Sequence, residues 1–261
     1  MKIGIYDSGI GGLSVLHQAR KMLPDAEFLY YADEKHVPYG EKTREEIKGY
    51  VEEILNFLID HGVDAVVIAC NTATSVAKKE FRNTFSVPIV GMEPAVKKAV
   101  RMQQDETKRI FVTATPITIY GEKLDHLIEQ VDAHHKVDKY PLQKLVRFAE
   151  RCNFDSPEID EYLRNELKGF DFDRYEYIVL GCTHFNYFKE HFRTVFGKDV
   201  HFVDGNEGTV RQLMRVLPKE AYERKDKPGT AYYYSGRLVN DYEKHQIQRY
   251  MDQLDKMYDI N

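Results

Sequence analysis

Two segments of this chain repeat one arrangement, an apolar run that ends in a cysteine. Residues 65–69 form a continuous apolar run rich in β-branched side chains, which is typical of a buried parallel strand, and Cys70 follows it. Asn71 or Thr72 is expected to cap the helix that comes next. The run 177–181 ends in Cys182 in the same way. Because ligands bind at the C-terminal edge of open α/β sheets, the repetition predicts two similar halves that face each other.

Strand and helix patterns alternate along most of the chain. The segment 132–171 is expected to hold one weak strand and two helices, and a helix to about residue 85 is expected after Cys70. Such alternation predicts βαβ units and parallel sheets, hence an α/β fold. Further strands are expected at 2–6, 27–31, 87–91, 109–113 and 201–203.

The chain is expected to form two lobes. The polar stretch 103–108 resembles a linker, and we place the second lobe at residues 98–207. Residues 1–97 form the expected first lobe, which residues 208–261 complete. That tail carries a strand at 231–234 followed by a helix, and we expect it to pack back on the first lobe.

Composition excludes several classes of protein. A chain of 261 residues that is 43% hydrophobic has enough apolar side chains for sizeable cores. Its net charge of −5 gives no basic footprint for nucleic acid or an anionic membrane. No apolar run of about 18 residues exists, so neither a membrane span nor a signal peptide is expected. Three cysteines are few for a disulfide scaffold, which favours a reducing cytoplasm.

The cysteines differ in expected role. A lone cysteine is more often a small buried hydrophobe than a reactive group, and this is our interpretation of Cys152. The duplication favours acid/base chemistry for Cys70 and Cys182. Half-ionising a thiol of pKa near 8.5 at neutral pH requires about 1.5 pKa units, or roughly 2 kcal/mol. A helix N-terminus in a partly buried site supplies up to about 2 kcal/mol, so we expect a working thiolate.

Other polar residues are expected near these cysteines. Asp7 ends the first strand before the glycine-rich turn 8–12, whose N–H groups suit a carboxylate; turn geometry alone is the alternative. His184 is expected to be a general acid/base or an orienting group, or else a satisfied surface histidine. A zinc site is disfavoured because the spacing is wrong and no CxxC exists. The turn at Tyr39 either offers its hydroxyl to a ligand or is only a turn.

These segments together resemble the signature series of the glutamate racemases. The similarity extends from residue 4 to about 210, in that family's order and spacing, and its motifs are Asp7-Ser8-Gly9-x-Gly11-Gly12, Pro38-Tyr39-Gly40, Ala69-Cys70-Asn71-Thr72-Ala73, Val90-Gly91-x-Glu93-Pro94 and Leu180-Gly181-Cys182-Thr183-His184-Phe185. The resemblance implies two α/β lobes related by pseudo-twofold symmetry, with the active site in the cleft between them. It also implies that no cofactor and no metal are used.

The resemblance assigns roles to individual residues. Cys70 and Cys182 are implied to flank the substrate Cα, with Cys70 acting on D-glutamate and Cys182 on L-glutamate. Asp7 and His184 match auxiliary catalytic residues, and Glu150 falls near a further glutamate where the local match is poorer. Substrate-binding positions of the family are matched by Asp7, Ser8, Pro38, Tyr39, Gly40, Asn71, Thr72, Thr115, Thr118, Thr183 and His184.

The expected function is therefore cofactor-independent racemisation of glutamate in the cytoplasm, supplying D-glutamate for peptidoglycan. We expect a homodimer that binds glutamate and no nucleic acid or membrane. Residues 32–36, 186–188 and 204–206 depart from the common family pattern, which leaves side-chain specificity and subunit packing open. The alternatives are a racemase of another amino acid such as aspartate, and a non-catalytic protein that binds an acidic metabolite.

Overall fold

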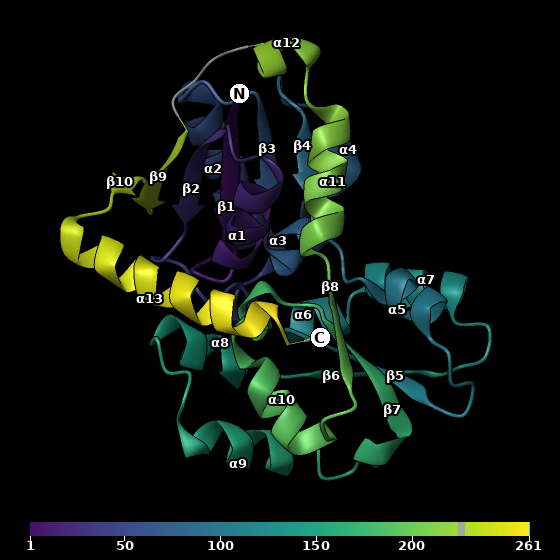
Figure 1. Cartoon of the computed structure of the whole chain (residues 1–261). Coiled ribbons are helices and arrows are strands. Elements are labelled where there is room, and N and C mark those ends of the chain that lie inside the picture. Colours follow the sequence, from purple (N-terminus) through teal and green to yellow (C-terminus); the bar gives the residue numbers. More distant parts are fainter. Residues whose placement is uncertain (224–227, 261) are drawn as a thin grey trace.

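The first of two parallel sheets is built from both ends of the chain. The computed structural model describes residues 1–223 and 228–260 (Figure 1). The strand order is β10-β9-β2-β1-β3-β4, with only β10 antiparallel to its neighbour. The bounds are β1 Lys2–Asp7, β2 Glu27–Ala32, β3 Ala65–Ile68, β4 Ile89–Gly91, β9 Gly229–Tyr234 and β10 Arg237–Leu238. Because β9 pairs with β2, the C-terminal segment returns to the first sheet, as expected.

The second sheet is wholly parallel. Its order is β6-β5-β7-β8, with β5 Arg109–Ala114, β6 Val137–Pro141, β7 Tyr175–Leu180 and β8 His201–Asp204. Two parallel sheets in an α/β chain confirm the predicted fold class. The lobe boundaries after residues 97 and 207 stay a prediction.

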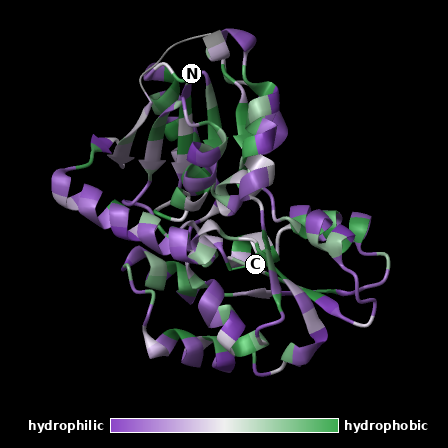
Figure 2. Ribbon diagram, in the orientation of Figure 1, coloured by the Kyte–Doolittle hydropathy of each residue, from purple (hydrophilic) through white to green (hydrophobic). Residues whose placement is uncertain are grey.

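Helices cover both sheets, and their apolar faces explain where they pack. In α2, the side chains of Ile47, Val51 and Leu55 are fully buried at helical spacing. Figure 2 shows the apolar residues gathered on the strands and on the inward faces of the helices. The helices with regular α geometry are α1 Leu13–Met22, α2 Arg44–Asp60, α3 Asn71–Val76, α4 Lys79–Arg82, α5 Val96–Met102, α6 Pro116–Ile119, α7 Glu122–Val131, α8 Lys144–Glu150, α9 Pro157–Glu166, α10 Lys189–Phe196, α11 Asn206–Val216, α12 Lys219–Glu223 and α13 Asp241–Tyr258.

Helix α13 joins the two lobes. It packs on α1 of the first lobe and on the 3₁₀ helix η3 (Thr183–Phe188) of the second, and Figure 1 shows it lying across both. Tyr250 donates a hydrogen bond to the Glu150 carbonyl at 3.1 Å, and Gln253 donates to the Tyr187 carbonyl at 3.1 Å. In the described part of the chain, no helix has the length and apolar character that a membrane crossing requires.

The prediction of a single helix after Cys70 is wrong, because two short helices, α3 and α4, occupy that segment. The hydroxyl of Thr74 bonds to the carbonyl of Ile68 and that of Ser75 to the carbonyl of Thr72. Such local bonds compete with helix propagation, and this polar, β-branched sequence has low helix propensity. After Cys182 the chain likewise passes through η3 before α10 begins.

The start of α2 provides a test of the local fold. Thr43 and Glu46 form a reciprocal capping box, with Glu46 N–H donating to Thr43 Oγ1 at 3.2 Å. Thr43→Ala should lower the free energy of unfolding by about 1 kcal/mol, measured by urea denaturation. Thr194→Ala is the control, because that exposed hydroxyl bonds a carbonyl inside α10 and caps nothing. An equal loss in both variants would contradict the capping role.

Candidate active site

The C-terminal ends of β1, β3 and β7 meet at one cavity between the lobes. Its volume is about 280 Å³, counting space open to solvent. All of the predicted site residues line it except Asp7, Thr118 and Glu150, each of which is hydrogen-bonded to a lining residue. The lining residues are Ser8, Pro38, Tyr39, Gly40, Cys70, Asn71, Thr72, Thr115, Val146, Cys182, Thr183 and His184. Both predicted thiols therefore face the same space.

Cys70 itself caps the helix that follows it. Its Sγ accepts a hydrogen bond from the Ala73 N–H at 3.4 Å, so the expectation that Asn71 or Thr72 caps this helix is wrong. The hydroxyl of Thr72 instead reaches Thr115 in the second lobe at 2.8 Å. The amide of Asn71 donates to Met92 Sδ at 3.3 Å, while its Oδ1 is buried and has no hydrogen-bond partner in the described part of the chain.

The Cys70 thiol holds its proton in this structure. Burial raises the pKa of Cys70 to about 12, with a further contribution from the nearby Asp7 carboxylate. The Ala73 N–H and the Ser8 hydroxyl act in the opposite direction but are weaker. The expectation that a helix N-terminus makes this thiol half-ionised is therefore wrong, because desolvation of the thiolate outweighs the local donors.

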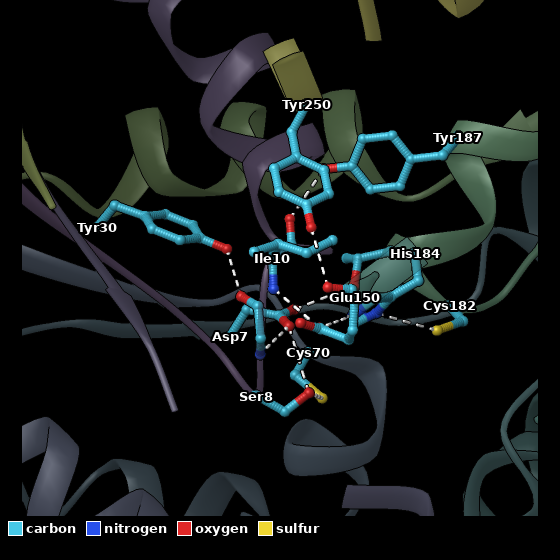
Figure 3. Close-up of polar contacts among 12 residues, drawn as sticks. Asp7, Ser8, Ile10, Tyr30, Cys70, Glu150, Cys182, His184, Tyr187 and Tyr250 are labelled. Carbon is cyan, nitrogen blue, oxygen red and sulfur yellow. Dashed lines mark hydrogen bonds and ion pairs between the residues drawn. The ribbon is translucent and has the colours of Figure 1, made fainter. Parts of the chain in front are cut away.

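A chain of polar groups leads from Cys70 to Asp7 (Figure 3). Cys70 Sγ donates to Ser8 Oγ at 3.6 Å, and Ser8 Oγ donates to Asp7 Oδ1 at 3.3 Å. Burial raises the pKa of Asp7, although the charge of His184 opposes the shift. Thr183 donates to Asp7 Oδ2 at 3.0 Å and so connects this chain to the second lobe. Asp7 is thus a buried carboxyl two hydrogen bonds from the Cys70 sulfur.

A second chain leads from Cys182 to Glu150. The Cys182 sulfur lies 3.7 Å from His184 Nδ1, and His184 Nε2 lies 2.5 Å from Glu150 Oε1. Burial acts to lower the pKa of His184, but the contacts with Cys182 and Glu150 prevail and raise it well above its usual value. His184 is only 2% exposed, so the surface-histidine alternative is wrong. The structure also places Glu150 beside the predicted auxiliary residues.

The glycine-rich turn after Asp7 allows these side chains to approach the backbone. A Cβ on Gly9 would overlap the Glu150 carboxylate, and one on Gly11 would overlap the His184 ring. Neither glycine has a positive φ, so close approach, rather than an unusual turn, requires them. The Ile10 N–H donates to Glu150 Oε1 at 3.0 Å, so this turn holds a carboxylate of the protein itself.

The Tyr39 hydroxyl already forms hydrogen bonds to other side chains of the protein. It donates to Asp33 Oδ2 at 2.6 Å and accepts from the Tyr6 hydroxyl at 2.7 Å. Pro38 and Gly40 line the cavity beside it, whereas Thr118 lies behind Thr115, whose hydroxyl donates to it at 3.3 Å.

Several residues at the site escaped the sequence analysis. Asp33 is 2% exposed and directly follows β2, a strand-end position like that of Asp7, which is the sequence feature that marks it. Tyr30 donates to the Gly9 carbonyl at 2.7 Å and Tyr187 to the Ile10 carbonyl at 2.9 Å, which holds the turn in place. No feature of the sequence marks Val146 as a site residue, because an apolar residue in a helix normally indicates only core packing.

Within residues 1–223 and 228–260, no group of three or more His, Cys, Asp or Glu side chains is arranged to hold a metal ion.

A family model, related sequences and solved structures all match this chain to the same family. A family model described as Asp/Glu/Hydantoin racemase matches residues 14–213. The glutamate racemase of Campylobacter curvus is 48% identical over 100% of both chains. Glutamate racemase 2 of Bacillus subtilis is 44% identical, covering 93% of this chain and 92% of the relative. A crystal structure of Escherichia coli glutamate racemase in complex with L-glutamate and the activator UDP-MurNAc-ala has a TM-score of 0.82 at 26% identity, covering 97% of this chain and 94% of that one.

The His184–Glu150 pair predicts a pH-dependent stability. Because folding raises the pKa of His184, the pair stabilises the fold fully below the unfolded pKa of about 6.5. This stabilisation is lost as pH rises through the higher pKa of the folded state. Glu150→Gln removes the anion, so its cost in unfolding free energy should be largest near pH 6 and smaller at about pH 9, measured by urea denaturation.

The control for this prediction is Glu166→Gln. The Glu166 carboxylate accepts a hydrogen bond from the exposed Tyr140 hydroxyl at 3.0 Å and is not paired with a histidine. Its cost should be small and equal at the two pH values. A cost of Glu150→Gln that does not change with pH would contradict a charged His184.

Proposed function

The chain belongs to the Asp/Glu/hydantoin racemase family and racemises glutamate, and we propose that Cys70 and Cys182 are the two acid/base groups of this reaction. The observation that carries the proposal is that the two sulfurs line one buried cavity from opposite lobes. Racemisation removes a proton from one face of Cα and adds one to the other face. A group within hydrogen-bond reach of each face is therefore needed.

The surroundings of the two thiols suit them to opposite roles, one as proton acceptor and the other as proton donor. A protonated His184 lies 3.7 Å from the Cys182 sulfur and would pair with its thiolate, which can accept a proton. Cys70 is a neutral thiol that can donate one, in keeping with its pKa of about 12. This arrangement suits L-glutamate: the Cys182 thiolate takes the Cα proton, and Cys70 delivers its proton to the opposite face.

The reverse reaction requires the proton of Cys70 to leave. Asp7 is the acceptor that the structure offers, through the Ser8 hydroxyl. A bound substrate brings an ammonium group into the site, and a cation near Cys70 and Asp7 lowers the pKa of both. The Cys70 thiolate would then take the Cα proton of D-glutamate, while Cys182, held by His184 and Glu150, would donate.

Polar groups of the cavity suit the substrate's charges. The hydroxyls of Thr72 and Thr115 can donate to carboxylate oxygens, and the unpartnered Oδ1 of Asn71 can accept from the ammonium group. The bond between Thr72 and Thr115 joins the lobes directly, so both hydroxyls must turn to the substrate when it binds. Fixed donors stabilise the charge that develops on the α-carboxylate as the proton leaves.

The cellular setting follows from the reaction as part of this proposal. We place the enzyme in the cytoplasm as a homodimer that supplies D-glutamate for peptidoglycan, and we expect no nucleic-acid or membrane partner. A racemase of aspartate is the alternative, because the departures at residues 32–36 and 186–188 lie near the site.

The direct test of function is loss of circular dichroism from L-glutamate on addition of purified protein. Activity is expected without any added cofactor and in the presence of EDTA. L-aspartate at the same concentration should react at least about tenfold more slowly. Faster turnover of aspartate would replace the assignment of substrate, and activity that EDTA abolishes and zinc restores would contradict the two-thiol mechanism.

Replacing each thiol tests the division of roles. Cys70→Ala and Cys182→Ala should each abolish net racemisation, because one thiolate must accept while the opposite thiol donates. Exchange of the Cα proton with heavy water needs only the abstracting thiol. By NMR, Cys182→Ala should retain exchange on D-glutamate and Cys70→Ala on L-glutamate. Equal residual exchange of both enantiomers in each variant would contradict the assignment.

Cys152→Ala is the matched control for both variants. Cys152 is a half-buried free cysteine that does not line the cavity, so its replacement should leave racemisation and exchange unchanged.

A further inference from the structure

A second pocket shares a wall with the substrate cavity. This pocket, which we call the outer pocket, is lined by Glu41, Pro116, Pro141, Gln143, Lys144, Arg147, Phe148, Arg151, Tyr162 and Glu166. Three of these residues directly follow cavity residues in the chain: Glu41 follows Gly40, Pro116 follows Thr115, and Arg147 follows Val146. The wall between the outer pocket and the cavity is therefore built from these three segments of the chain.

Gln143 forms part of this wall. It lines the outer pocket, and its amide lies against Gly40 of the cavity: a Cβ on Gly40 would overlap Gln143 Oε1 and lie 3.2 Å from Nε2. Gln143 precedes α8 at the N-cap position, yet its side chain makes no capping hydrogen bond. Only a glycine at position 40 permits this approach of the amide.

Both polar atoms of the Gln143 amide are buried and have no hydrogen-bond partner among the residues that the structure describes. Leaving a buried amide unpaired costs free energy, and native proteins rarely do so without a functional reason. An amide carries two N–H donors and one carbonyl acceptor, and the donors suit a carboxylate oxygen. Its position beside Gly40 makes a carboxylate-bearing substrate the natural partner.

An exposed ion pair beside Gln143 joins the two lobes at this point. Arg147 of α8 donates to Glu41 Oε1 at 2.6 Å and 3.1 Å, and Glu41 belongs to the 3₁₀ helix η1 (Tyr39–Glu41). The two side chains are 56% and 40% exposed, and exposed pairs of this kind hold weakly. The pair therefore contributes little to holding the lobes together at this point. The pocket is lined by three cationic side chains, Lys144, Arg147 and Arg151, and by the carboxylates of Glu41 and Glu166, so positive charge is in slight excess.

We infer that the outer pocket is the access route to the cavity and that Gln143 is a substrate-binding residue that closes it, donating its amide N–H to a carboxylate of the bound dicarboxylate. The inference rests on the proposed function, because it takes glutamate as the substrate. Gln143 moves no proton. It adds binding in the ground state and the transition state alike, so its loss raises KM and leaves kcat nearly unchanged.

Two substitutions of similar size test this role in the full-length enzyme. Gln143→Leu removes the amide and should raise KM for both enantiomers at least about tenfold, with kcat within about twofold of wild type. Gln143→Glu presents a negative charge to the substrate and should raise KM further. Because Leu replaces an unpaired amide, its thermal unfolding midpoint should equal or exceed that of wild type. Gln130→Leu and Gln130→Glu, at an exposed position of α7, are the matched controls and should change neither constant.

Binding of glutarate provides a readout that is independent of turnover. Glutarate carries both carboxylates but no amino group, so it binds without being racemised. By calorimetry, its Kd should rise at least about tenfold in both Gln143 variants and stay within twofold of wild type in the Gln130 variants. Unchanged KM and unchanged glutarate affinity in an active, folded Gln143→Leu enzyme would overturn the inference. Failure of the proposed function is distinguishable, because wild-type protein would then not racemise glutamate at all.

Discussion

The burial of several ionisable side chains in one space between two lobes is the constraint on which this structure depends. Asp7 is fully buried, and Cys70, Cys182 and His184 are at most 6% exposed. Charges in such a place persist only when other charges and hydrogen bonds compensate them. The compensation here comes from the facing lobe: Thr183 donates to Asp7, and the Ile10 N–H donates to Glu150. The position of the protons and the closure of the lobes are therefore coupled.

This coupling explains why the two halves share one arrangement of site residues but differ in the side chains that form it. Each sheet presents a cysteine at the end of a central strand, and each cysteine has a polar residue that leads to a carboxyl group. Cys70 reaches Asp7 through the Ser8 hydroxyl, while Cys182 reaches Glu150 through an imidazole. A hydroxyl carries no charge at neutral pH, whereas an imidazole can. One thiol is thus held neutral and the other lies beside a cation, which suits delivery of a proton from one side and its removal on the other.

The sequence predicts much of this arrangement because strand ends are a local signal. Asp7, Cys70 and Cys182 each follow an apolar run, and parallel strands bring such positions to one edge. What the sequence could not show is burial. The pKa of Cys70 is set by desolvation, so reasoning from the helix N-terminus gave the wrong direction. Likewise Glu150 and Gln143 belong to the short helical segment around α8, and their place depends on how α8 packs against Gly9 and Gly40 of the other lobe.

In the two-thiol mechanism, one substrate Cα lies between the two sulfurs. A crystal structure of the wild-type enzyme with D-glutamate tests it most directly. Both Sγ atoms should lie within about 4 Å of Cα, on opposite faces, close enough for each to exchange a proton with it. The Thr72 and Thr115 hydroxyls should be turned from each other to the substrate. A substrate that contacts only one sulfur in a closed site, or that binds outside the space between Cys70 and Cys182, would rule out the two-thiol mechanism.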